Sequence, residues 1–270
     1  MNTRTPSSVF SNTASATTHT EAPALGRGIT LLRVLAQTNN PMTLSELSDA
    51  IGASRSTVYS LLATLHQHGM VDKDLLHKTY RLGVGTFELG SAYLSQVSLL
   101  PAFNEVAQQL VAWCGETVKL AVLDGRDVVY LGKQEGLYSV RLVARVGSRM
   151  PAHATAVGKL LLAQLANDDL VQLYHGYDFP TRTPNTVNSF ALLHERVCHA
   201  RDHGYAMDDE ESALGLRCVA TPIRDHDGHV VAAMSIGVPN DRLDRDRMLE
   251  LTELALHYAQ EISYRLGWSN

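Results

Sequence analysis

Residues 53–69 have the sequence ASRSTVYSLLATLHQHG, and the interpretation of the whole chain starts from them. Apolar side chains recur there at the helical spacing i, i+3, i+4 and i+7, namely at Val58, Leu61, Leu62 and Leu65. This pattern predicts a helix with one buried face, capped by Ser54 and ended by Gly69. The opposite face carries polar side chains, at Arg55, Ser56, Tyr59, Ser60 and Gln67. Such a face suits either an ordinary surface helix or a helix that enters the major groove of DNA.

The residues on both sides of this helix favour the second interpretation. Residues 43–46 (TLSE) form a capping box and predict a short helix that stops at Gly52. A short helix, a tight turn and a longer capped helix is the order of a helix-turn-helix. Residues 70–73 and 79–82 are short strand candidates joined by a polar turn, as in a wing, and a further helix is expected from Leu25. We therefore expect a winged helix-turn-helix head over residues 25–85.

The composition fits a two-domain globular protein with a small part that reads DNA. The chain has 270 residues, of which 45% are hydrophobic, and a formal net charge of -5. This acidity argues against a protein that coats nucleic acid by bulk charge. Three cysteines give neither a disulfide framework nor a zinc-finger pattern, so we expect a reducing cytoplasm, and no apolar run has the length of a membrane span. Residues 1–24, rich in Ser, Thr and Ala, are expected to be a disordered tail.

After the head the pattern changes from helical to mixed. Residues 86–98 carry one narrow apolar stripe and predict a linker helix that pairs with a second copy or lies on a neighbouring domain. Residues 99–270 predict an α+β domain with an antiparallel sheet. Its expected strands are 117–123, 127–133, 139–144, 216–223 and 229–238. Its expected helices are 101–114, 155–166, 168–175, 186–203 and 241–266.

Several motifs, taken in this order, resemble the isocitrate lyase regulator (IclR) family of bacterial transcription factors. The resemblance runs from about Leu25 to Gly267. It is carried by residues 26–29 (GRGI), 56–58 (STV), 80–83 (YRLG), 146–159 (VGSRMPAHATAVGK), 208–211 (DDEE) and 215–220 (GLRCVA). The family implies a winged helix-turn-helix, a linker helix and a C-terminal domain similar to GAF and PAS ligand sensors, assembled as dimers or pairs of dimers. It also implies repression, the commoner behaviour of its members.

The residues expected to contact DNA lie in the head. They are Arg27, Thr43, Ser54, Arg55, Ser56, Thr57, Tyr59, Ser60 and Lys78. Many family members carry Arg at the position of Ser60, so one phosphate or base contact differs in this chain. The head is only mildly basic, and affinity should therefore depend on a dimer that presents two heads to the half-sites of a palindromic operator.

The motifs of the second domain predict a pocket for a small organic acid. Thr155 can cap a helix whose small first residues leave backbone N–H groups open to a carboxylate, although the same helix could simply pack. The resemblance to family members that bind small keto acids supplies the other positions. The expected effector-binding residues are Thr155, Ala156, Val157, Asp208, Leu216, Cys218 and Ser235. Gly237 stands where some of those members have a second serine, so the acid can differ.

Two other classes of function fit parts of the sequence. A thiol redox regulator could work through Cys198 and Cys218, and oxidation would then release DNA as effectively as a metabolite. An enzyme could pair Cys218 with His153 as nucleophile and base, or use the acidic run 208–211 to hold a metal, but neither arrangement has supporting spacing. We therefore expect no catalytic residue, metal or cofactor. The expected partners are double-stranded DNA, the acid and further copies of the chain, with no membrane.

Overall fold

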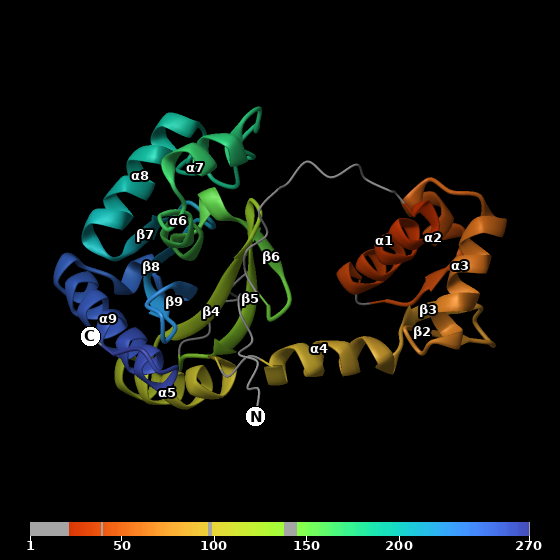
Figure 1. The fold of residues 1–270 in the computed structure, drawn as a ribbon, viewed down its shortest axis with the longest axis horizontal. Coiled ribbons are helices and arrows are strands. Elements are labelled where there is room, and N and C mark those ends of the chain that lie inside the picture. The colour runs from red at the N-terminus through yellow and green to blue at the C-terminus, as the bar shows by residue number, and fades with distance from the viewer. Residues whose placement is uncertain (1–21, 39, 97–98, 138–144, 270) are drawn as a thin grey trace, which may run out of the picture. The chain divides into compact units, whose positions relative to one another are not determined.

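A computed structural model describes residues 22–38, 40–96, 99–137 and 145–269 of the chain. The chain divides into two compact units, and the division falls between Ser95 and Gln96. Figure 1 shows the helices and strands of both units. Within the described ranges, no helix is long and apolar enough to cross a membrane.

The first unit is a winged helix-turn-helix, and this prediction is confirmed. Its elements are α1 (Pro23–Gln37), β1 (Met42–Thr43), α2 (Leu44–Ile51), α3 (Arg55–Gln67), β2 (Val71–Asp74), β3 (Thr79–Leu82) and α4 (Val84–Gln96). The three strands form an antiparallel sheet in the order β1-β3-β2. Leu31 of α1, Leu47 of α2 and Leu62 of α3 meet in its core and are fully buried.

Local capping interactions set the boundaries of α2 and α3. The Thr43 hydroxyl accepts the N–H of Glu46, and the Glu46 carboxylate accepts the N–H of Thr43 at 2.7 Å, which completes the predicted capping box. Ser54 caps α3 by accepting the N–H of Thr57 at 3.3 Å. Gly52 ends α2 with φ +63°, a left-handed conformation that glycine adopts without a Cβ clash. These contacts fix the turn between the two helices.

The first unit differs from the sequence expectation at its edges. α1 begins at Pro23, because proline suits the first position of a helix. Only residues 22–24 of the expected tail are therefore described, and the rest lies outside the described residues. α4 begins at Val84 instead of residue 86, and residues 97–98 of the expected linker helix are not among those described. No sequence pattern predicts β1, because two residues show no alternation.

The second unit is an α+β domain built on a six-stranded antiparallel sheet, as predicted. Its strands are β4 (Thr117–Asp124), β5 (Asp127–Gln134), β6 (Arg149–Pro151), β7 (Ala206–Asp209), β8 (Leu216–Arg224) and β9 (Val230–Pro239), in the spatial order β6-β5-β4-β9-β8-β7. Its helices are α5 (Leu99–Cys114), α6 (Ala156–Leu162), α7 (Asn167–Tyr174), α8 (Phe190–His203) and α9 (Arg245–Arg265), with 3-10 turns η1 (Ala152–Ala154) and η2 (Asn240–Arg242).

Different helices cover the two faces of this sheet (Figure 1). α5 and α9 pack on one face, where Val118 and Leu120 of β4 and Ile236 of β9 belong to an apolar core. α6 and α8 cover the other face. Because successive side chains of a strand point to opposite faces, Lys119 of β4 and Ser235 of β9 lie on the side of α6. The polar side chains of β4 and β9 that line a cavity therefore lie on the face of the sheet that α6 covers.

Several elements of the second unit differ from the sequence expectation. α6 ends at Leu162 and not at residue 166, because the Arg201 guanidinium of α8 donates to the carbonyls of Ala163 and Leu165 at 2.9 and 2.8 Å. α8 begins at Phe190 and not at residue 186, because Ser189 acts as its N-cap. α9 likewise begins at Arg245 and not at residue 241, after its N-cap Asp244. No pattern predicts the short strands β6 and β7. The strand expected over 139–144 lies outside the described residues.

Candidate functional site

The exposed face of α3 is the first candidate site. Four expected DNA-contacting residues of this helix are exposed to solvent: Arg55, Ser56, Tyr59 and Ser60. Tyr59 keeps 54% of its surface exposed, so its ring and phenol hydroxyl are open to a partner. Ser54 and Thr57 are less available, because the Ser54 hydroxyl lies 2.9 Å from that of Thr57 and caps the helix. The face can thus offer a guanidinium, a phenol and hydroxyls to a duplex.

Neighbouring elements add two residues to this face. Arg55 Nη2 donates a hydrogen bond of 2.8 Å to the Ser45 hydroxyl of α2, so the guanidinium is held at the start of α3. The Lys73 ammonium of β2 lies 5.7 Å from the centre of the Tyr59 ring. Neither Ser45 nor Lys73 is among the expected residues, because their proximity to α3 depends on how α2 and the wing pack. A lysine in a predicted wing strand is the one local signal.

The remaining expected DNA contacts have different surroundings. Arg27 of α1 and Lys78 of the β2–β3 turn are exposed, and Lys78 has φ +55°. Asp74 shapes this turn by accepting the N–H of His77 at 3.0 Å, and its hydrogen bonds with His77 lower the pKa of the Asp74 carboxyl to about 2. Thr43 is half-buried and its hydroxyl is engaged with Glu46, so its part is to position α2.

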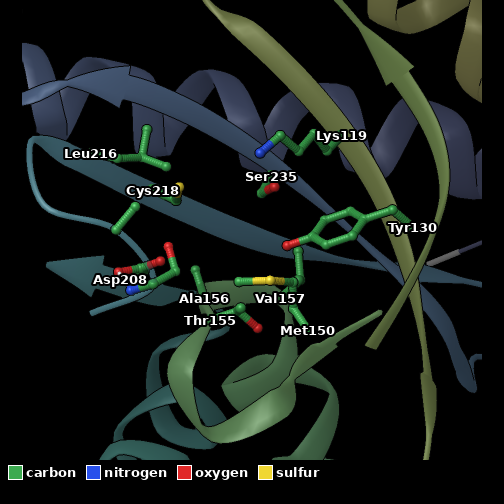
Figure 2. A pocket seen from close by; sticks show the side chains of 12 residues that line it. Lys119, Tyr130, Met150, Thr155, Ala156, Val157, Asp208, Leu216, Cys218 and Ser235 are labelled. Atoms are coloured by element: carbon green, nitrogen blue, oxygen red, sulfur yellow. Dashed lines mark hydrogen bonds between the residues drawn. The ribbon is translucent and has the colours of Figure 1, made fainter. Parts of the chain in front are cut away.

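The second candidate site is a small pocket between the start of α6 and the sheet, called here the α6 pocket (Figure 2). The structure brings all seven expected effector-binding residues to it: Thr155, Ala156, Val157, Asp208, Leu216, Cys218 and Ser235. It adds five that the sequence does not predict: Lys119, Tyr130, Met150, Ser212 and Ala213. The space open to a water-sized sphere is about 20 Å³. A single water needs roughly 10–15 Å³ by this measure, so a larger ligand requires side chains to move.

The loop between β7 and β8 is fixed by buried polar contacts beside this pocket. Asp208 Oδ1 accepts the N–H groups of Glu211 and Ser212 at 2.7 and 3.2 Å. Burial raises the pKa of the Asp208 carboxyl. Lys159 of α6 forms an ion pair with Glu211 at 2.5 Å, and both side chains are more than nine-tenths buried. The loop and α6 are therefore joined by a salt bridge that water scarcely reaches.

The thiol in the pocket has the character of a packing group. Burial raises the pKa of Cys218 to about 12, so the reactive thiolate is suppressed at neutral pH. This argues against a redox role or a nucleophilic role for Cys218. His153 does not line the α6 pocket, since its ring packs edge-on against Tyr177 and Phe179, and its Nε2 lies 3.2 Å from the Pro180 carbonyl. In the part of the chain that the structure describes, no three His, Cys, Asp or Glu residues are grouped to hold a metal ion.

Comparisons with known proteins bear on both sites. The family model of the IclR helix-turn-helix domain matches residues 24–75, and that of the bacterial transcriptional regulator IclR C-terminal domain matches residues 91–264. The HTH-type transcriptional regulator XynR of Escherichia coli K12 is 34% identical over 242 residues, which cover 90% of this chain and 96% of XynR. The HTH-type transcriptional repressor AllR of the same strain is 35% identical over 246 residues, or 91% of each chain.

A solved structure agrees with these relatives. The IclR protein of Thermotoga maritima superposes with a TM-score of 0.71 at 29% identity, covering 90% of this chain and 98% of that one. A winged helix-turn-helix followed by an α+β domain of this kind defines a DNA-binding transcriptional regulator with a ligand-sensing domain. The chain belongs to the IclR family of bacterial transcriptional regulators, and the resemblance seen in its motifs is confirmed.

The Lys159–Glu211 pair gives a prediction about stability. Lys159→Met leaves the Glu211 carboxylate buried without a partner, which should lower the free energy of unfolding by about 3–5 kcal/mol. The double variant Lys159→Met, Glu211→Met removes both charges and should recover most of that loss. Urea unfolding, followed by circular dichroism, gives the free energy of unfolding of the parent, the single variant and the double variant. A single variant as stable as the parent would contradict this role, as would a double variant less stable than the single one.

Proposed function

We propose that this chain is a transcriptional repressor whose affinity for DNA is controlled by a small organic acid bound in the α6 pocket. The observation that supports the proposal is the convergence there of residues from separate segments of the chain, among them Asp208, Cys218 and Ser235. Asp208 offers an acceptor and Ser235 a hydroxyl to keto or hydroxyl oxygens. The repressor assignment is supported by the name of AllR, a relative that is 35% identical.

Binding of the acid requires the pocket to enlarge. Met150 is nearly buried and lines the cavity, and its unbranched side chain has three rotatable bonds. Tyr130 and Val157, which also line the cavity, are stiffer side chains. We therefore expect Met150 to change its rotamer when the acid enters.

For the head, we propose that α3 lies in the major groove with Arg55 and Tyr59 towards bases and phosphates. Ser56 and Ser60 add hydroxyl contacts, while Arg27 and Lys78 contact the backbone on either side. A dimer or a pair of dimers presents two heads to a palindromic operator, since one weakly basic head makes few phosphate contacts. α4 connects the head to the second unit along the chain and is the proposed route by which the acid changes the spacing of the heads.

The head assignment is tested by two substitutions on α3. Arg55→Ala and Tyr59→Ala should each weaken operator binding about 10-fold or more, because each removes a contact worth roughly 1–3 kcal/mol. Affinity for the acid should stay as in the parent. Arg33→Ala is the control, since Arg33 is an exposed arginine of α1 outside the proposed surface. Fluorescence anisotropy with labelled operator measures the change, and equal losses in all three variants would refute the placement of α3.

The pocket assignment is tested by Ser235→Ala and Asp208→Asn. Both should shift the response to the acid to higher concentration while operator affinity without acid stays unchanged, because these side chains meet the ligand and not DNA. Asp208→Asn keeps an oxygen for the Glu211 and Ser212 N–H groups and so spares the loop. Ser269→Ala, at an exposed position outside the pocket lining, is the control. Release of operator by the acid is measured by anisotropy, and an unchanged response in both pocket variants would refute the assignment.

A further inference from the structure

Lys119 is a buried lysine in a strand that is otherwise apolar on both sides of it. It lies in β4 between Val118 and Leu120, and only 6% of its surface is exposed. Across the described residues, its ammonium has neither an ion pair nor a hydrogen bond. Lysine is almost never buried to this extent without a partner, because an unpaired charge loses its hydration. Burial accordingly lowers the pKa of Lys119.

The surroundings of Lys119 leave its charge available to the α6 pocket. Its ammonium lies 5.5 Å from the centre of the Tyr130 ring, which faces the same cavity. Ser235 stands directly opposite Lys119 in the β4–β9 register, so the two side chains share one face of the sheet. Figure 2 shows Lys119 and Ser235 close together above the Tyr130 ring. The cavity therefore has a cation, a hydroxyl and a phenol on one wall.

The other charges near the pocket are already paired or hydrogen-bonded. Lys159 is bound to Glu211, and Asp208 accepts two backbone N–H groups. α6 has only seven residues, so its start adds little electrostatic attraction for an anion. A ligand that brings one negative charge would complete the coordination of Lys119. A dianion would bring a second charge without a counterpart, and a neutral ligand would leave the ammonium unpaired.

We propose that Lys119 is the residue that selects a singly charged carboxylate as the effector, with Ser235 donating a second hydrogen bond to the same group. This inference rests on the proposed function, because it names the charge class of the ligand in the α6 pocket. The carboxylate lies against β4 and β9, and the remainder of the acid extends towards Asp208 and the start of α6. Lys119 is then a determinant of ligand specificity that contributes nothing to the stability of the free protein.

The test compares acids with their neutral amides in variants of Lys119. The probes are pyruvate, 2-hydroxybutyrate and benzoate, the three corresponding amides, and succinate as a dianion. The proteins are the parent, Lys119→Met, Lys119→Arg and Lys133→Met. Lys133 is the matched control, since it faces Lys119 in the β4–β5 register, is paired with Glu135 at 2.8 Å and does not line the pocket. Thermal shift detects binding, and isothermal titration calorimetry gives the dissociation constants.

We expect at least one of the three acids to bind the parent more tightly than its amide and than succinate. Lys119→Met should weaken binding of that acid about 10- to 100-fold, because it removes a charge-assisted hydrogen bond. Lys119→Arg should keep much of the affinity, and Lys133→Met all of it. The melting temperature of ligand-free Lys119→Met should stay level or rise, because an unpaired buried charge is removed.

The possible failures are distinguishable. If none of the acids binds the parent, the proposed organic-acid control is wrong and the role of Lys119 is wrong with it. If an acid binds the parent and Lys119→Met equally, or if its amide binds as tightly, the role of Lys119 alone is refuted. If ligand-free Lys119→Met melts well below the parent, the lysine has a structural function and the inference is likewise overturned.

Discussion

The second unit depends on the way its β7–β8 loop is fixed to α6. Lys159 reaches from the helix to Glu211, while Asp208 accepts the backbone N–H groups of Glu211 and Ser212. The Thr183 and Thr186 hydroxyls donate to carbonyls of the same loop, each at 2.7 Å. A buried network of this kind is stable only while nearly all of its members are satisfied. It therefore holds the loop and α6 in one arrangement and defines the wall of the pocket between them.

The sheet beneath this network has an apolar core on each face, and the polar groups of the α6 pocket lie on the face towards α6. On the side of α5 and α9, residues such as Leu120 and Ile236 are fully buried among other apolar side chains. The side of α6 has an apolar core of its own, which includes Leu162 and Leu193, so both faces supply hydrophobic stabilisation. On the side of α6, Lys119 and Ser235 occupy alternate positions of the same strands. Buried polar groups that lack full pairing cost stability, and such a cost is common at binding sites. The apolar cores on the two faces of the sheet compensate for that cost.

The sequence could predict the head and much of the second unit, but only part of the pocket. The head follows from local signals, because the Ser54 cap and the Gly52 turn each act within a few residues. The pocket positions follow from the family resemblance. Lys119 is not predicted, because its place opposite Ser235 is set by the register of strands that are distant in the sequence. A lysine within an apolar strand was a usable signal. The early end of α6 is not predicted for a similar reason, since Arg201 of α8 donates hydrogen bonds to the carbonyls just beyond it.

We propose that acid binding and operator binding are coupled within one protein. Thermodynamic linkage then requires the coupling to be reciprocal, so the factor by which the acid changes operator affinity must equal the factor by which operator changes acid affinity. Calorimetric titration of the acid into the free protein and into the operator complex measures the second factor directly. We expect the two acid affinities to differ, by the same ratio as the operator affinities measured with and without acid. Identical acid affinity in the two titrations would contradict it.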